Sequence, residues 1–275
     1  MLPADIAETV AHALAEDLGS GDLSAALIDP ARELEARIIS REAGVLCGQA
    51  YAEAAFAQLS SRLQVEWQAA EGAEIAPDQQ LCSIRGPAAA LLSGERSALN
   101  FLQLLSATAT QTRAFVTRMQ GSKTRLLDTR KTLPGLRLAQ KYAVRVGGGH
   151  NHRLGLFDGI LIKENHLAAI GGIAPAIARA RALAPVLTRV EVEVETLEQL
   201  DEAVAAGADM VLLDNFSLEH LRSAVQRVAG HVPLEASGNI FLDSVAAVAA
   251  TGVDYLSVGS ITRNVQSLDL SLRYL

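Results

Sequence analysis

The chain is poor in cysteine and has no long apolar run. Its 275 residues include only Cys47 and Cys82, whose spacing matches no metal-binding motif. Two thiols in a chain of this length indicate a reducing compartment rather than a disulfide framework. No stretch approaches about 18 consecutive apolar residues, and no cationic start precedes an apolar run at the N-terminus. We therefore expect a cytoplasmic protein without a membrane span.

The chain also lacks an excess of positive charge. It carries 24 Lys and Arg residues against 31 Asp and Glu residues, a net charge of -7. This balance argues against a protein that coats nucleic acid or an anionic membrane. The hydrophobic content of 49% argues against disorder, and the length suits one large domain or two modest ones.

The cations that are present gather in one segment. Residues 123–163 hold nine Lys or Arg residues and two acids, and all four lysines of the chain lie there. This pattern indicates either a local anion site or a solvated basic face, and composition alone favours neither.

Two patterns of secondary structure divide the chain. Before residue 88, strand-like segments at 36–46, 65–69 and 81–84 and a helical segment at 49–59 indicate an α+β domain with a mainly antiparallel sheet. A long helix is expected over 88–119, with a break near Ser106 left open. Beyond it, strands alternate with helices, as in successive βα units of a parallel sheet. The expected strands are 125–129, 159–163, 190–195, 210–215, 234–237 and 255–259.

Six parallel strands are too few for a standard eight-stranded barrel, so an open α/β sheet and an incomplete barrel both remain. In either fold the chemistry lies at the carboxyl ends of the strands. Helix capping explains some of the polar residues there, but not Arg130, Lys131, Lys163 or Glu193. These polar ends are 128–131, 163–166, 193–195, 214–215, 237–239 and 259–260.

Two further segments carry unusual side chains. Every second residue of 190–195 is Glu, which indicates either an edge strand with one wet face or a polar barrel interior. Three glycines at 147–149 precede His150, His152 and Arg153, an arrangement that suits a flexible turn or part of an anion pocket. The His150–His152 spacing also fits a zinc pair, but the later strand ends lack the further histidines that such a site needs.

Together these residues indicate a two-sided site. A cationic sector holds Arg130, Lys131, His152, Arg153 and Lys163, and suits an anionic substrate. The other sector pairs carboxylates suited to Mg²⁺ with small residues suited to phosphate. This sector comprises Glu193, Asp214, Ser237, Gly238, Asn239, Gly259 and Ser260.

At these residues the sequence closely resembles the quinolinate phosphoribosyltransferase family. The resemblance extends over almost the whole chain in family order, and DTRKT together with GGGHNHR makes it specific. The matching segments are EDLGSGD (16–22), ERSALN (95–100), DTRKTLPGLR (128–137), GGGHNHRLGL (147–156), LIKENH (161–166), EVEV (191–194), LDN (213–215), EASG (235–238) and GVDY (252–255).

The resemblance implies a reaction and a fold. The reaction joins quinolinate to phosphoribosyl pyrophosphate with Mg²⁺, and gives nicotinate mononucleotide, pyrophosphate and CO₂ in NAD synthesis. The fold is an N-terminal α/β sandwich, expected over 1–107, followed by an incomplete α/β barrel of about six strands over 108–265. The C-terminal tail, 266–275, is expected to return to the first domain.

The resemblance also assigns roles to residues. Thr129, Arg130, His152, Arg153 and Lys163 would bind quinolinate, together with Arg96 from the neighbouring subunit of a homodimer. Lys131, Glu193 and Asp214 would be catalytic, and the two acids would hold Mg²⁺. Phosphoribosyl pyrophosphate would be bound by Lys131, Glu193, Asp214, Ser237, Gly238, Asn239, Val258, Gly259 and Ser260.

Three alternatives stand beside this interpretation. One is a catalytically silent binding protein, which the complete set of charged residues disfavours. A molybdenum-locus relative shares the fold, but it lacks the full LDTRK and IKENH segments found here. A Schiff-base lyase would use Lys163 as its nucleophile, as aldolases do.

Overall fold

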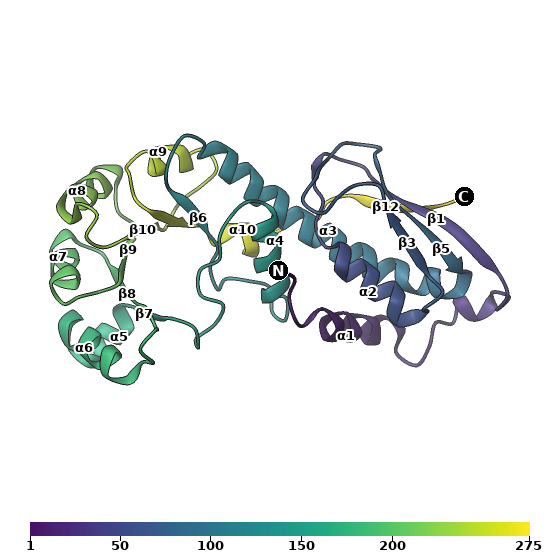
Figure 1. The fold of residues 1–275 in the computed structure, drawn as a ribbon, viewed down its shortest axis with the longest axis horizontal. Helices are drawn as coiled ribbons and strands as arrows, with labels where there is room; N and C mark the ends of the chain where they lie inside the picture. The colour runs from purple at the N-terminus through teal and green to yellow at the C-terminus, as the bar shows by residue number, and fades with distance from the viewer. The chain divides into compact units, whose positions relative to one another are not determined.

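The computed structural model describes the whole chain, Met1–Leu275 (Figure 1). Its internal contacts divide the chain into two compact units. The first unit comprises residues 1–113, 132–148 and 261–275, and the second comprises 114–131 and 149–260. No helix has the length and apolar content needed to cross a membrane.

The first unit is built on a four-stranded antiparallel sheet with strand order β12-β1-β5-β3. The strand expected over 36–46 is two strands, because the chain bends at residues 41–42, where the Ser40 hydroxyl donates to the Glu42 carbonyl at 2.6 Å. Of the short pair β2–β4, only β2 lies within an expected strand. A strand of two residues, such as β4, is too short to show an alternation of apolar and polar residues. The strands are β1 (Glu33–Ser40), β2 (Gly44–Val45), β3 (Gln64–Trp67), β4 (Glu74–Ile75), β5 (Gln80–Pro87) and β12 (Leu270–Tyr274).

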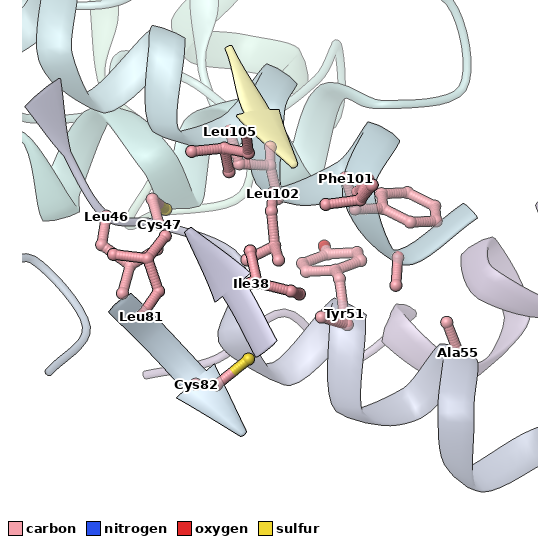
Figure 2. Packing of buried hydrophobic residues seen from close by; sticks show 14 of the residues in the cluster. Ile38, Leu46, Cys47, Tyr51, Ala55, Leu81, Cys82, Phe101, Leu102 and Leu105 are labelled. Carbon is pink, nitrogen blue, oxygen red and sulfur yellow. The ribbon is translucent and has the colours of Figure 1, made fainter. Parts of the chain in front are cut away.

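Helices pack on this sheet and enclose the core of the first unit. Ile38 of β1 and Leu102 of α3 lie between the layers in Figure 2, beside the stacked rings of Tyr51 and Phe101, whose centroids are 5.1 Å apart. Each of these four side chains is buried, so their apolar surface stabilises the unit. The helices are α1 (Ile6–Leu18), η1 (Ala25–Leu27), α2 (Gln49–Leu59), α3 (Ala88–Arg118) and α4 (Arg137–Val146).

The long helix α3 is continuous through Ser106, so the break left open there does not occur. The Ser106 hydroxyl is buried and bonds both the N–H and the carbonyl of Cys47, at 2.9 and 3.1 Å. A serine that would weaken an isolated helix thus holds a neighbouring segment in place. The helix crosses the boundary at residues 113 and 114, so both units share it.

Residues 132–148 group with the first unit, although the sequence places them after the expected boundary at 107. Ala139 and Ala143 of α4 belong to the hydrophobic core of this unit, and the Tyr142 hydroxyl donates to Glu71 at 2.9 Å. The tail also lies here, because β12 pairs with β1 in the register Ile38–Leu272.

The second unit contains a six-stranded parallel sheet with order β6-β11-β10-β9-β8-β7. All six expected strands are present, and the α/β fold class is confirmed. A parallel bridge between His150 and Leu127 extends the sheet beyond β6. The strands are β6 (Arg125–Leu127), β7 (Ile160–Ile162), β8 (Val190–Val194), β9 (Met210–Asp214), β10 (Leu234–Ser237) and β11 (Tyr255–Ser257).

Helices follow the strands of this sheet and cover one of its faces (Figure 1). The valines of β8 are buried, and α6 and α7 pack against that strand. The alternate face of β8, which carries Glu191 and Glu193, is therefore turned to the inside of the curved sheet. The helices are α5 (Glu164–Ile170), α6 (Ile173–Leu183), α7 (Leu197–Ala205), α8 (Leu218–Val228), α9 (Val245–Ala249) and α10 (Ser260–Arg263).

Candidate active site

The strand register of the second unit brings the polar strand ends side by side. Ser237 pairs with both Asp214 and Ser257, so β9, β10 and β11 end at one level. Ile162 pairs with Val192, which places Lys163 next to Glu193 at the ends of β7 and β8. Five neighbouring strands thus present their carboxyl ends at one edge, as expected for a βα active site.

Lys163 and Glu193 form an ion pair across this edge, between the Lys163 Nζ and the Glu193 Oε2. The Lys163 side chain is 43% exposed and that of Glu193 is 15% exposed. The cation is therefore held by a half-buried carboxylate while part of its surface faces solvent, where an anionic ligand could reach it.

Asn215, Gly238 and Asn239 form a small polar loop cluster beside Asp214. The Asn215 Nδ2 donates to the Asp214 Oδ2 at 2.8 Å, and the Asn239 Nδ2 donates to the Asn215 Oδ1 at 3.0 Å. Asn215, Gly238 and Asn239 have φ of 55°, 92° and 51°, in the left-handed region. These residues border a cavity of about 270 Å³ that Ser237 also lines. Asn215 was not among the predicted site residues, although it follows Asp214 directly.

The strand end at Val258–Ser260 meets the segment after β6. A Cβ on Gly259 would lie 2.9 Å from the Lys131 Cδ and 3.3 Å from the Thr129 Oγ1, so the glycine leaves room for the Lys131 side chain in this position. The Thr129 Oγ1 also accepts the Lys131 N–H at 3.0 Å. Lys131 and its neighbour Arg130 are exposed, as groups that meet a substrate from solvent would be.

The segment from Asn151 to Arg153 is fixed by a buried carboxylate, that of Asp128. Its two oxygens accept the Asn151 Nδ2 at 2.6 Å and the His152 N–H at 2.9 Å. The Arg153 guanidinium donates to the Gly159 carbonyl at 3.1 Å. Burial and the nearby charge of Arg130 both lower the pKa of Arg153. Two guanidinium groups close enough to repel each other form a site that a dicarboxylate would stabilise.

His152 lies against two buried acids inside the curved sheet. Its Nε2 is 2.9 Å from the Glu191 Oε2 and 3.4 Å from the Glu235 Oε2, and the Arg153 N–H donates to its Nδ1 at 2.7 Å. Burial lowers the pKa of His152, but its contacts with the two acids outweigh burial and raise the pKa to about 10. The raised pKa favours a proton on both ring nitrogens, but the Arg153 N–H points at Nδ1 and leaves no room for a proton there. The contacts therefore favour a ring whose proton is on Nε2.

The acids of this cluster are residues that the functional prediction did not single out. The alternating Glu pattern of 190–195 did indicate a polar interior, and Glu191 and Glu193 do face it, whereas Glu195 lies beyond the strand and is exposed. His150 is also exposed and takes no part in the cluster, so the disfavoured His150–His152 metal pair does not form.

Arg96 lies on α3 in the first unit and lines a cavity of about 440 Å³. His12, Glu16, Asp17 and Asn100 line the same cavity. Arg96 and Asn100 are one helical turn apart, and therefore face the same side of α3. The motifs 16–22 and 95–100, separate in the sequence, thus meet at one surface of the first unit.

This fold and these strand ends define an α/β-barrel enzyme in which a cationic sector lies beside a sector of carboxylates and small residues. Comparison with known protein families identifies the class of enzyme more specifically. The profile of the quinolinate phosphoribosyl transferase N-terminal domain matches residues 22–106, and that of the C-terminal domain matches 108–273. The chain belongs to the quinolinate phosphoribosyltransferase family.

Individual relatives agree with this assignment. A probable nicotinate-nucleotide pyrophosphorylase (carboxylating) of Bacillus subtilis is 44% identical over 95% of this chain and 90% of its own length. The enzyme of that name from Mycobacterium leprae is 43% identical over 96% and 95%. The solved nicotinate-nucleotide pyrophosphorylase of Francisella tularensis superposes with a TM-score of 0.96 at 46% identity, covering 100% of this chain and 98% of that one.

Proposed function

We propose that the protein transfers the phosphoribosyl group of phosphoribosyl pyrophosphate to quinolinate, with loss of CO₂. The products are nicotinate mononucleotide and pyrophosphate, and the reaction belongs to the de novo synthesis of NAD. The observation that carries this proposal is the meeting of a cationic sector with paired carboxylates at one edge of the sheet, in a chain whose relatives bear the name of this reaction.

Quinolinate would lie in the cationic sector. Arg130, Arg153 and Lys163 supply charges for its two carboxylates, and the planar fork of each arginine matches a pair of carboxylate oxygens. Thr129 and His152 would complete this sector. The Lys163 ammonium is held by Glu193 in the free protein, so the substrate carboxylate would share it or take it over.

Phosphoribosyl pyrophosphate would occupy the opposite sector. Ser237 ends β10 and is followed by Gly238 and Asn239, and Val258, Gly259 and Ser260 follow β11, so that small side chains and backbone N–H groups would face the phosphates. Glu193 and Asp214 offer hard oxygen ligands at neighbouring strand ends, and Mg²⁺ often takes one or two carboxylates together with substrate phosphates. When bound there, Mg²⁺ would neutralise charge on the leaving pyrophosphate.

The reaction follows from this placement. The bond between ribose C1 and pyrophosphate breaks as C1 bonds to the quinolinate nitrogen. The ring nitrogen then carries positive charge, which stabilises the electron pair left on the adjacent ring carbon when its carboxylate departs as CO₂. That carbon takes up a proton. Lys131, beside Gly259, would contact the leaving phosphates and the substrate edge, and we infer a catalytic role for it.

A homodimer would complete the site. Arg96 would reach the site of the neighbouring subunit, and its position on α3, in a cavity that Glu16 and Asp17 also line, suits a surface that meets a partner. The protein would act in the cytoplasm on small-molecule substrates.

The proposal is tested by incubating the purified protein with quinolinate, phosphoribosyl pyrophosphate and Mg²⁺, beside a parallel reaction with nicotinate. We expect nicotinate mononucleotide and CO₂ from quinolinate, and little product from nicotinate, because the second carboxylate is missing. Absence of mononucleotide from quinolinate would overturn the assignment. Trapping with borohydride tests the Schiff-base alternative at Lys163.

A further inference from the structure

Glu191 and Glu235 lie one layer below the strand ends that form the site, where both approach the ring of His152. Side chains two residues apart on a strand share a face. Glu191 therefore lies below Glu193 on β8, and Glu235 lies below Ser237 on β10. Neither acid reaches the strand ends, so neither belongs to the layer that meets substrate.

The burial of these acids is unusual. Glu235 is fully buried and Glu191 is 5% exposed. Besides its approach to His152, Glu235 has no hydrogen-bond partner for either oxygen, and the Glu191 Oε1 has none. Two buried carboxyl groups beside one imidazole destabilise the fold, because a buried polar group without hydrogen-bond partners is costly. This cost points to a functional role for the two acids.

The imidazole links these acids to the quinolinate sector. Its Nε2 faces the two acids, which in their ionised form can only accept hydrogen bonds, and its Nδ1 accepts the Arg153 N–H at 2.7 Å. On the other side, Asp128 holds the His152 backbone. The charged groups around the ring are thus Glu191, Glu235, Asp128 and the side chain of Arg153.

We propose that Glu191 and Glu235 are positioning residues that fix the His152 ring and, through its Nδ1, the backbone of Arg153. This proposal deepens the proposed function, on which its kinetic part rests. The acids would keep Nε2 protonated and pointed inward, so that Arg153 presents its guanidinium to the dicarboxylate in one orientation. In metal sites, removing a residue that orients a ligand commonly costs about tenfold or more in affinity or activity, and we expect a similar effect of the residues that orient His152.

The kinetic test uses Glu235→Gln and Glu191→Gln, which keep the side-chain shape and remove the acid. Glu195→Gln, an exposed residue beyond the same strand, is the matched control. We expect the KM for quinolinate to rise about tenfold in both cluster variants, with the KM for phosphoribosyl pyrophosphate within about twofold of wild type. Glu235→Asp, which retains the acid, should recover part of the loss. An equal rise in both KM values, or none, would overturn the proposal.

A second measurement does not depend on activity. Nitrogen NMR of the free protein labelled in its histidines, with His152 assigned by its loss in His152→Asn, reports which ring nitrogen carries a proton. We expect a proton on Nε2 in wild type, unchanged by MgCl₂, and mixed tautomers in the double variant Glu191→Gln/Glu235→Gln. The same tautomer in wild type and double variant would overturn the positioning role. Loss of the Nε2 proton on adding MgCl₂ would also overturn it, because the cluster would then be a cation site.

The two measurements separate the two proposals. If wild-type protein makes no mononucleotide while the His152 tautomer depends on the acids, the proposed function fails and the anchoring of His152 stands. If the enzyme is active and the His152 tautomer is the same in wild type and in the double variant, only the positioning role fails.

Discussion

Gly238 and Asn215 approach each other so closely that a Cβ on Gly238 would lie 2.2 Å from the Asn215 Oδ1. Gly238 also has φ of 92°, a conformation that side chains rarely adopt. The close approach lets Asn215 bridge Asp214 and Asn239 in the same cluster. The glycine is therefore required both by its backbone and by its neighbour.

Replacing Gly238 by alanine tests this packing. Backbone strain of about 1–2 kcal/mol and overpacking of about 1–3 kcal/mol should together lower the free energy of unfolding by about 2–5 kcal/mol. If the loop moves to relieve the clash, the KM for phosphoribosyl pyrophosphate should rise instead. Urea unfolding and substrate kinetics measure the two effects.

Gly230→Ala is the matched control for this variant. Gly230 has a similar φ of 79°, but nothing lies within 4 Å of the position that a Cβ would take there, so only the backbone strain applies. We expect a loss of about 1–2 kcal/mol and normal kinetics. Equal effects of the two substitutions would contradict the role given to Asn215.

The ion pair between Lys163 and Glu193 gives a second prediction. Lys163→Gln removes a cation of the quinolinate sector and leaves the half-buried Glu193 carboxylate without its partner. A hydrogen bond to a charged group is worth about 1.5–3 kcal/mol, which corresponds to a rise of about tenfold or more in the KM for quinolinate. Steady-state kinetics with each substrate varied in turn measure the KM for quinolinate and the KM for phosphoribosyl pyrophosphate.

The control is Lys123→Gln. Lys123 pairs with Asp254 at 3.2 Å, and its side chain is 69% exposed. An exposed ion pair contributes about 0–1 kcal/mol to stability, and Lys123 precedes β6, away from the carboxyl ends of the strands, so activity should stay near that of wild type. A normal KM for quinolinate in Lys163→Gln would remove that residue from the substrate sector.

Periodic patterns in the sequence predicted much of the fold. The helix over 49–59 and the strand over 234–237 have the expected bounds, because each has an apolar pattern between turn residues. The chain turn after Ser40 is held by local and distant hydrogen bonds, such as that of the Arg41 N–H to the Asp269 carbonyl, which carry no periodic signal. The grouping of 132–148 with the first unit depends on contacts of Ala139 and Tyr142 with residues far away in sequence.

The site could be predicted only in its outer layer. Residues at strand ends follow from the βα rule, which is why Lys163, Glu193 and Ser237 lie where expected. The deeper cluster joins His152, from a loop, to acids of β8 and β10, two strands that are not neighbours in the sheet. The alternation of Glu in 190–195 indicated the interior face, but no local pattern names a partner across a curved sheet.

The burial of Cys47 and Cys82 gives a prediction about their reactivity. Burial raises the pKa of Cys82 to about 12, and burial with the nearby Glu71 raises that of Cys47. Since the thiolate is the reactive form, only about one Cys82 in 10,000 is reactive at pH 8. We expect almost no reaction of the folded protein with a thiol reagent at pH 8, and two thiols per chain after unfolding in guanidinium. Rapid loss of one thiol from folded protein would contradict this burial.

The proposed contribution of Arg96 to a neighbouring subunit makes the last prediction. Arg96→Ala and Lys163→Gln should each lower activity strongly, because each removes a cation proposed to bind quinolinate. If the two residues of one site come from different subunits, mixed dimers of the two variants contain one intact site and one doubly damaged site. Random exchange of subunits should then restore about a quarter of wild-type activity.

The mixing experiment needs two controls. Each variant mixed with itself after the same unfolding and refolding should stay at its own low activity. Sedimentation should show that the mixture has the size of the wild-type assembly. No recovery in an assembly of wild-type size would mean that Arg96 and Lys163 serve the same subunit's site, and a monomer in sedimentation would exclude a shared site altogether.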